Sequence, residues 1–172
     1  RPDYKAAHLI RDQRMMRRDF NHPSVIIWSL GNEAGFGDTF VACYDWLKAN
    51  DPTRPVQYER AEKASQNDII CPMYASPKWC EDFAKGNPDR PLIQCEYAHA
   101  MGNSMGNFKE YWDLIRKYPN YQGGFIWDFV DQALRWPSNE GGTDHIFAFG
   151  GDFNEYDPSD GSFNCNGVIA AD

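Results

Sequence analysis

The sequence predicts an α/β fold in which short parallel strands alternate with helices. Five short apolar runs are spaced along the chain, amphipathic helix patterns separate most of them, and polar residues follow them at their C-terminal ends. Such a chain forms either a doubly wound sheet or part of a (β/α)₈ barrel. A complete barrel takes about 250 residues. This chain has 172, so a barrel reading implies that the first strands are missing.

The first helix is expected from Asp3 to Phe20, because apolar residues recur there at helical spacing and Pro23 excludes helical geometry just before itself. A second is expected from Asp38, which can cap it, to about Asn50. Further helices are expected at residues 77–85 and 107–118, and strands at 25–30, 55–58, 68–73, 91–95 and 123–129.

The strand at 25–30 is a nearly continuous apolar run, which is typical of a strand buried on both faces of a parallel sheet. From Val130 onward Gly, Asn, Asp and Ser dominate, which predicts a long C-terminal loop region with room for one short strand. The chain shows no internal repeat and no linker, so residues 1–172 are expected to belong to one domain.

Composition narrows the classes of partner. The net charge is −8 and the basic residues are scattered, which argues against binding to nucleic-acid phosphates or to anionic membranes. Aromatic residues make up 15% of the chain, which permits a carbohydrate site, because aromatic faces stack on sugar rings. The sequence therefore favours a neutral substrate.

The cysteines and the start of the chain bear on location. Five cysteines without a CxxC pair predict free thiols in a reducing compartment, not a disulfide framework or a zinc site. No signal peptide or membrane-spanning run is found, although the chain starts as if cut from a longer one. A cytoplasmic location is expected, and a periplasmic location of the parent protein stays open.

Two glutamates stand in corresponding places after apolar strands. Glu33 follows the first strand through Gly31 and Asn32, and Glu96 follows the strand that ends at Cys95. In β/α barrels the active site is built from the C-terminal ends of the strands. Two carboxylates about 5 Å apart there would serve retaining glycoside hydrolysis. A lone Glu at a strand end is more often solvated or salt-bridged, so placement alone leaves both interpretations open.

The amino-acid sequences of several segments resemble those of glycoside hydrolase family 2, and in particular those of its large bacterial β-galactosidases. The resemblance spans nearly the whole chain. It implies a partial TIM (β/α)₈ barrel that holds approximately strands four to eight. The segments that carry it are collinear with the family: residues 22–33, 68–74, 91–104, 122–132, 150–153 and 163–167.

The resemblance implies roles for the residues nearest the reaction. Glu96 is the expected nucleophile and Glu33 the expected general acid/base of a double-displacement mechanism. Asn32 is expected to hydrogen-bond the sugar 2-hydroxyl. Tyr74 is expected to lie close to Glu96 and to donate a hydrogen bond that orients it.

The same resemblance implies substrate and metal contacts. His99 is expected to contact galactosyl hydroxyls, and Trp127 to form the aromatic wall against which the galactose ring packs. Glu33 is also expected to touch a magnesium ion. Phe163, through its backbone oxygen, and Asn166, through its side chain, are expected to hold a sodium ion. The remaining ligands of both ions would lie outside this chain.

The expected activity is hydrolysis of terminal β-D-galactosyl residues. The alternatives are a related β-glucuronidase or β-mannosidase, or a non-catalytic carbohydrate-binding module that uses the Trp and Tyr faces. Expected partners are a β-galactoside, the rest of the parent polypeptide and, in the intact enzyme, further copies of the same chain. A half-barrel leaves two sheet edges exposed, so the isolated fragment is expected to be inactive.

Overall fold

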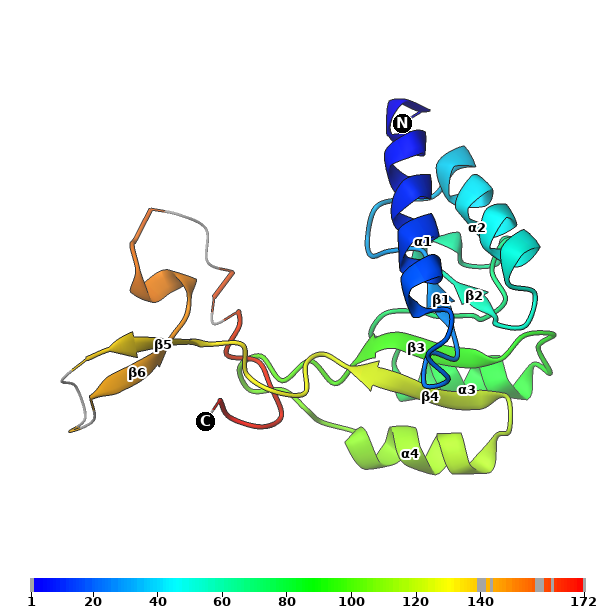
Figure 1. Ribbon diagram of the computed structural model, residues 1–172. Coiled ribbons are helices and arrows are strands. Elements are labelled where there is room, and N and C mark those ends of the chain that lie inside the picture. Colours follow the sequence, from blue (N-terminus) through cyan, green and yellow to red (C-terminus); the bar gives the residue numbers. More distant parts are fainter. Residues whose placement is uncertain (1, 139–141, 143, 157–159, 162, 172) are drawn as a thin grey trace.

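The computed structural model describes residues 2–138, 142, 144–156, 160–161 and 163–171 (Figure 1). Short parallel strands lie at its centre and four helices cover them. A thin C-terminal arm extends away from this body. The order of elements confirms the predicted alternation of strands and helices.

All four predicted α-helices are present, and their ends lie within a few residues of the predicted ones. A 3₁₀ turn, η1 (Pro2–Tyr4), leads into α1. Asp38 is the first residue of α2 and Gly37 is its N-cap, so the predicted capping role of Asp38 is wrong. Ser76 does cap α3, because its hydroxyl accepts the backbone N–H of Trp79 at 3.2 Å. The helices are α1 (Lys5–Asp19), α2 (Asp38–Asn50), α3 (Pro77–Lys85) and α4 (Phe108–Lys117).

The parallel strands follow one another in chain order. β1 (Trp28–Ser29) pairs with β2 (Val56–Gln57), and β3 (Leu92–Tyr97) pairs with β4 (Tyr121–Ile126). Residues 68–73 connect the two pairs. Their first N–H donates to Val56 at 2.9 Å, and parallel bridges join Ile70 to Leu92 and Met73 to Glu96. The five segments therefore form one arc of parallel strands, as in part of a barrel.

Several strands are shorter than predicted, and β1 is not buried on both faces. Trp28 is buried, whereas Ile26 is 68% exposed and Phe125, on β4, is 55% exposed. The helices cover only one face of the arc. In a closed barrel the opposite strands would cover the other face, and among the described residues no strand does so. The apolar residues of the predicted strands therefore indicate the burial that a strand would have in a closed barrel, not the burial found in this arc.

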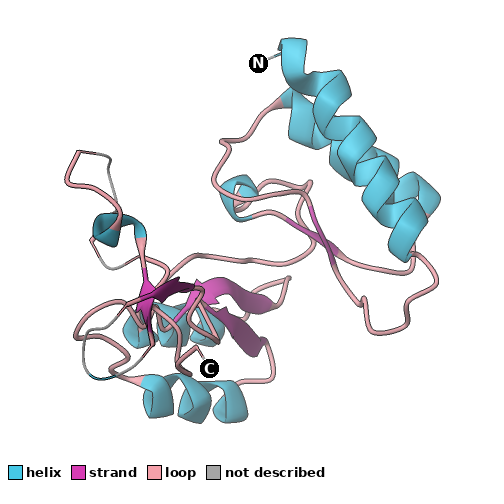
Figure 2. Cartoon of the chain, turned by 60° about the vertical axis from the view of Figure 1, so that its left-hand side comes forward, coloured by secondary structure: helices cyan, strands magenta, loops and turns pink. Residues whose placement is uncertain are grey.

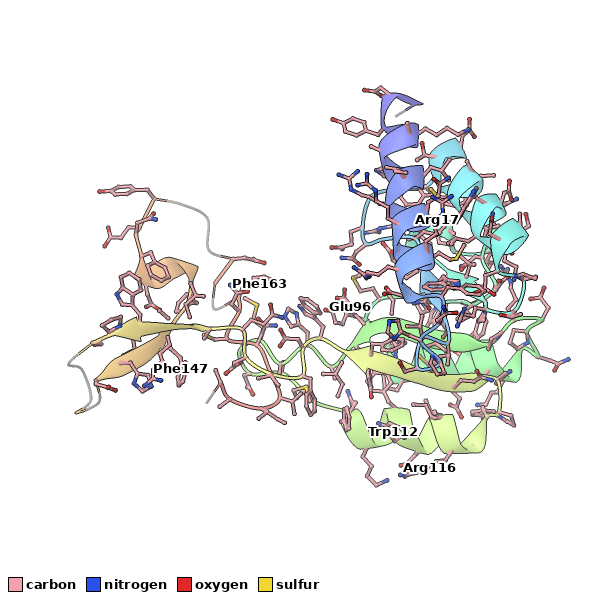
Figure 3. The ribbon with its side chains drawn as sticks, viewed as in Figure 1. Arg17, Glu96, Trp112, Arg116, Phe147 and Phe163 are labelled. Carbon is pink, nitrogen blue, oxygen red and sulfur yellow. The ribbon has the colours of Figure 1, made fainter. Side chains whose placement is uncertain are left out.

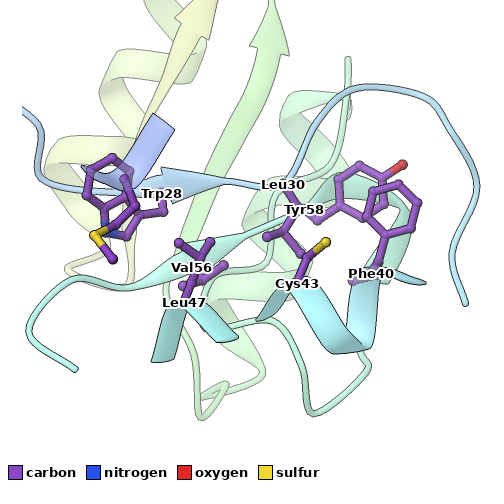
Figure 4. Packing of buried hydrophobic residues seen from close by; sticks show 9 residues of the cluster. Trp28, Leu30, Phe40, Cys43, Leu47, Val56 and Tyr58 are labelled. Carbon is purple, nitrogen blue, oxygen red and sulfur yellow. The ribbon is translucent and has the colours of Figure 1, made fainter. Parts of the chain in front are cut away.

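Two hydrophobic clusters hold the body together. One lies between α1, α2 and the first strand pair, and includes Trp28, Phe40 and Leu47 (Figure 4). The other lies between α3, α4 and the second strand pair, and includes Leu92 and Tyr97. Figure 2 shows the corresponding two groups of helices on either side of the connecting loops.

The C-terminal region contains more structure than predicted. β5 (Leu134–Pro137) and β6 (His145–Ala148) form an antiparallel hairpin, and η4 (Gly150–Asp152) follows it. We expected a loop with room for one strand. Every residue of β5 is exposed, so this strand lacks the buried apolar face that makes a strand visible in a sequence.

The last described segment returns to the end of β4. Backbone hydrogen bonds join residues 164–169 to residues 128–132, and an isolated parallel bridge joins Val130 to Ile169. The C-terminal segment therefore lies beside the C-terminal end of the strands. In the described part of the chain, no helix is both long and apolar enough to span a bilayer.

A buried carboxylate links α2 to the first strand. Asp51, 1% exposed, accepts hydrogen bonds from the Trp28 indole at 2.8 Å and from Arg54 at 2.7 Å. Burial alone would raise the pKa of Asp51, but the hydrogen bonds from Thr53, Arg54 and Trp28 outweigh it and hold the pKa below its usual range. Asp51 therefore stays ionised at neutral pH.

Asp51→Asn is expected to destabilise this region by about 3 kcal/mol, because Arg54 would keep a largely buried charge without its partner. Hydrogen exchange of peptides covering residues 25–58 should become about 100-fold faster where exchange follows local opening. Asp45→Asn, on the exposed face of α2, is the matched control. Since folding lowers the pKa of Asp51, its ionised form stabilises the folded state. This contribution to the free energy of unfolding is full at neutral pH and is lost as the pH falls below about 4. Equal protection in the two variants would contradict this role.

Candidate active site

The candidate residues gather where the parallel strands end. Glu33 lies in the turn after β1, Tyr74 directly follows the 68–73 segment, and Glu96 is the penultimate residue of β3. Trp127 directly follows β4. Because all these segments run in the same direction, their C-terminal ends form one edge of the arc. Figure 3 shows Glu96 at the end of β3 that faces the C-terminal segments.

Tyr74 and Glu96 form the hydrogen bond that the resemblance implied. The Tyr74 hydroxyl donates to Oε2 of Glu96 at 2.6 Å, and the Tyr74 backbone N–H donates to the carbonyl of Glu96 at 2.9 Å. Burial, the hydrogen bond to Glu96 and the charges of Glu96, Cys95 and Glu33 all raise the pKa of Tyr74. The phenol therefore remains a donor, and the charges of both candidate carboxylates act on it.

His99 adjoins this pair. Its ring lies nearly parallel to the Tyr74 ring, with centroids 5.8 Å apart, and edge-on to the Phe163 ring at 6.4 Å. The Ser104 hydroxyl donates to the His99 carbonyl at 2.6 Å. Nε2 of His99 is buried and has no hydrogen-bond partner among the described residues. An unpartnered buried nitrogen is costly, and a ligand hydroxyl is one group that could satisfy it.

Glu33 is held by two residues of η2 (Glu59–Ala61), a 3₁₀ turn that follows β2. Its side chain is exposed, and its Oε1 lies 3.3 Å from the Arg60 guanidinium. Its backbone N–H donates to Oε1 of Glu59 at 2.7 Å. The candidate acid/base is thus placed by contacts to the neighbouring strand end.

The other predicted site residues lie nearby with fewer described contacts. Asn32 is exposed and lines a cavity of about 380 Å³ with Glu59 and Phe125. Trp127 is half-buried, and its backbone N–H donates to the Tyr97 carbonyl at 3.1 Å. A second cavity, of about 630 Å³, is bordered by residues of the 68–73 segment, Tyr74 and Arg60. No described contact joins Asn32 or Trp127 to Glu33 or Glu96.

A sequence model described as "Glycosyl hydrolases family 2, TIM barrel domain" matches residues 1–172. The chain belongs to glycosyl hydrolase family 2. It is 50% identical to a β-galactosidase of Aeromonas hydrophila subsp. hydrophila and 47% identical to one of Leuconostoc mesenteroides subsp. mesenteroides. Each match covers 99% of this chain and 18% of the relative. The chain therefore spans less than a fifth of the length of these relatives.

Two solved structures superpose on most of this chain with a similar fold. A family 2 member from Bacteroides cellulosilyticus superposes with a TM-score of 0.56 at 28% identity, covering 70% of this chain and 17% of that one. A β-glucuronidase from Ruminococcus gnavus superposes with a TM-score of 0.60 at 19% identity, covering 85% of this chain and 32% of that one. The second likeness concerns the fold alone. Together with the family match, these superpositions confirm that the arc is part of a TIM barrel.

The described residues around Glu33 do not by themselves make up a magnesium site. Among the described residues, no group of three or more His, Cys, Asp or Glu side chains could hold a metal ion. Beside Glu33 lies a cation, Arg60, and the nearby Glu59 is already paired with it. A magnesium ion at Glu33 would need further ligands, which the resemblance implies lie outside this chain, so magnesium binding stays a prediction.

The predicted sodium ligands lie in the segment that returns to the end of β4. Asn166 is buried, and its Oδ1 accepts the backbone N–H of Asn164 at 2.6 Å. Its carbonyl accepts the N–H of Asp128, directly after Trp127, at 3.3 Å. Nδ2 of Asn166 has no partner among the described residues. An amide oxygen has two lone pairs, so Asn166 could still ligate a cation, and the sodium site stays a prediction.

Sequence reasoning missed Glu59 and Arg60. The signal was present, because Glu59 directly follows the predicted strand at 55–58. Glu33 and Glu96 were singled out for a similar placement after a strand. The helices and strands alone do not show that Glu59 turns toward Glu33, since that contact depends on the register of β1 against β2.

Proposed function

We propose that this chain is the catalytic segment of a retaining β-galactosidase, with Glu96 as nucleophile and Glu33 as general acid/base. The observation that carries the proposal is the Tyr74–Glu96 hydrogen bond at 2.6 Å, together with the charge of a second carboxylate, Glu33, which also acts on Tyr74. The relatives named β-galactosidase support the substrate class. Because the chain spans a small part of their length, the activity belongs to a longer parent protein.

In the first step a carboxylate oxygen of Glu96 attacks the anomeric carbon while Glu33 gives its proton to the leaving glycosidic oxygen. The C–O bond to the leaving group breaks, and a glycosyl ester forms on Glu96. Tyr74 orients the attacking carboxylate and remains protonated throughout, as its raised pKa requires. Nucleophilic catalysis of this kind splits one difficult displacement into two easier ones.

In the second step Glu33, now a carboxylate, takes a proton from water, and the water oxygen attacks the anomeric carbon. The ester bond to Glu96 breaks and the product keeps the β-configuration. The same residue serves both steps, because the ester removes the negative charge of Glu96 and so makes deprotonation of Glu33 easier. The exposed position of Glu33 gives water access to it.

The remaining residues are assigned to substrate binding. Asn32 would hydrogen-bond the sugar 2-hydroxyl, and Trp127 would pack against the ring. The buried, unpartnered Nε2 of His99 supports a contact with a galactosyl hydroxyl. If magnesium binds at Glu33, it would add positive charge beside the acid/base. Sodium at Phe163 and Asn166, a cytoplasmic location and assembly into homo-oligomers are retained as predictions.

The test is labelling of the parent protein with a 2-deoxy-2-fluoro β-galactoside carrying a good leaving group, followed by peptide mass spectrometry. The fluorine slows hydrolysis of the ester, so the nucleophile stays labelled. We expect a 2-fluorogalactosyl group on Glu96. Labelling only by the glucuronic acid or manno analogue would move the substrate to a uronide or a mannoside. Saturable binding without labelling by any analogue would favour a carbohydrate-binding module.

A further inference from the structure

The backbone at Glu33 adopts an unfavourable conformation. Its φ is 50°, in the left-handed region, which is unfavourable for a non-glycine residue. Gly31 and Gly35 on either side also have positive φ, which glycine adopts readily. The Glu33 side chain is exposed and gains nothing from packing. Other contacts must therefore fix this turn.

Two consecutive residues after β2 supply them. The N–H of Glu33 donates to the carboxylate of Glu59 at 2.7 Å, and the N–H of Ala34 donates to the hydroxyl of Tyr58 at 2.9 Å. The acceptor of the first bond is a carboxylate, and hydrogen bonds to charged groups are stronger than those between neutral groups, so this bond can offset the unfavourable backbone conformation. The neighbouring strand thus holds the turn at two successive backbone groups.

Both acceptors are themselves fixed. Tyr58 is 1% exposed, and its ring stacks on Phe40 with centroids 4.3 Å apart (Figure 4). The Glu59 side chain is 6% exposed, and its Oε1 lies 3.2 Å from Nε of Arg60. The guanidinium of Arg60 also reaches Oε1 of Glu33 at 3.3 Å. Arg60 thus compensates the charge of the Glu59 carboxylate that accepts the N–H of Glu33.

We propose that Tyr58 and Glu59 are positioning residues for Glu33: they fix the backbone of the turn and thereby the direction in which the acid/base projects toward the glycosidic oxygen. They touch neither the substrate nor the reacting atoms in this role. The proposal rests on the proposed function, because it assigns these residues to the proton transfers of that mechanism. A displacement of about 1 Å at a catalytic group is enough to slow its step about 100-fold.

The test is the dependence of rate on the leaving group in the parent protein. In Glu59→Ala, kcat/KM for an alkyl β-galactoside should fall about 10- to 100-fold, because the leaving oxygen needs the proton. For an aryl β-galactoside whose phenol leaves without protonation, kcat/KM should change less than about 3-fold. Added azide, which needs no general base, should raise kcat on the aryl substrate. These readouts report proton transfer, so a purely structural role would not produce them.

Two further variants sharpen the result. Glu59→Gln retains an oxygen that can accept the N–H of Glu33, and should recover most of the loss on the alkyl substrate. Tyr58→Phe keeps the stacked ring and removes only the hydroxyl that accepts from the Ala34 N–H. It should also lower kcat/KM more for the alkyl than for the aryl substrate, but by a smaller factor than Glu59→Ala. It also tests the proposal if Glu59→Ala fails to fold. Glu62→Ala, an exposed glutamate in the same turn, is the control and should match the wild type.

The proposal is overturned if folded Glu59→Ala and Tyr58→Phe lose activity equally on both substrates, or lose none. The fraction of folded active sites is measured with the fluorinated galactoside, so loss of protein is not mistaken for loss of rate. Failure of the proposed function looks different, because the wild-type parent would then neither cleave β-galactosides nor be labelled. If Glu33→Gln shows the leaving-group dependence and the Tyr58 and Glu59 variants do not, only the positioning role falls.

Discussion

Glu96→Gln in the parent protein is expected to lower kcat for every β-galactoside, with loss on the order of 10⁶-fold when the nucleophile of a covalent mechanism is removed. The amide keeps the shape of the side chain and an oxygen that can accept from Tyr74 at the same position. It has no negative charge with which to attack the anomeric carbon. Both alkyl and activated aryl substrates need this attack, so the leaving group should make no difference.

The measurement is steady-state turnover on an alkyl and an aryl β-galactoside, with Glu110→Gln on the exposed part of α4 as the control. A second variant, Glu96→Gly, leaves space for azide beside the anomeric carbon. A single displacement by azide inverts the configuration, so the expected product is the α-galactosyl azide. Turnover of Glu96→Gln within about 10-fold of the wild type would remove Glu96 from the role of nucleophile.

The helices could be predicted well from the sequence, because their signals are local. Pro23 follows the end of α1, and Ser76 followed by Pro77 marks the start of α3. The strands were harder to bound, since a strand is defined by its neighbour. The segment at 68–73 has the apolar pattern of a strand and is hydrogen-bonded to β3, yet its pairing consists of two isolated bridges and not of a continuous ladder. Every residue of β5 is exposed, so its sequence shows no clear strand pattern.

The candidate site could be predicted only in part, because some of its contacts depend on how separate turns meet. The resemblance pointed to Tyr74 beside Glu96, and the hydrogen bond is present. The contacts of Glu33 could not be predicted, because they depend on how the turn after β1 meets the turn after β2. In the sequence, Arg60 has no local feature that distinguishes it from the other scattered basic residues. Its pairing with both Glu33 and Glu59 becomes visible only in three dimensions.

Glu33→Gln is expected to separate substrates by their leaving groups. General acid catalysis contributes about 10²- to 10⁴-fold, so kcat/KM for an alkyl β-galactoside should fall by that factor. An aryl β-galactoside with a good leaving group needs no proton in the first step, and its kcat/KM should fall less than about 10-fold. Its kcat should fall further, because water must still be deprotonated in the second step. Accumulation of the glycosyl ester on Glu96 is the expected result in mass spectra of the intact protein.

The stereochemistry of azide rescue then distinguishes the two carboxylates. In Glu33→Gln the ester on Glu96 still forms, with inversion, and azide attacks it with a second inversion, so the product is the β-galactosyl azide. In Glu96→Gly only one displacement occurs and the product is the α-azide. Opposite anomers from the two variants would assign the two roles independently of any rate. If Glu33→Gln gave the α-azide, or slowed alkyl and aryl substrates equally, Glu33 could not be the acid/base of this mechanism.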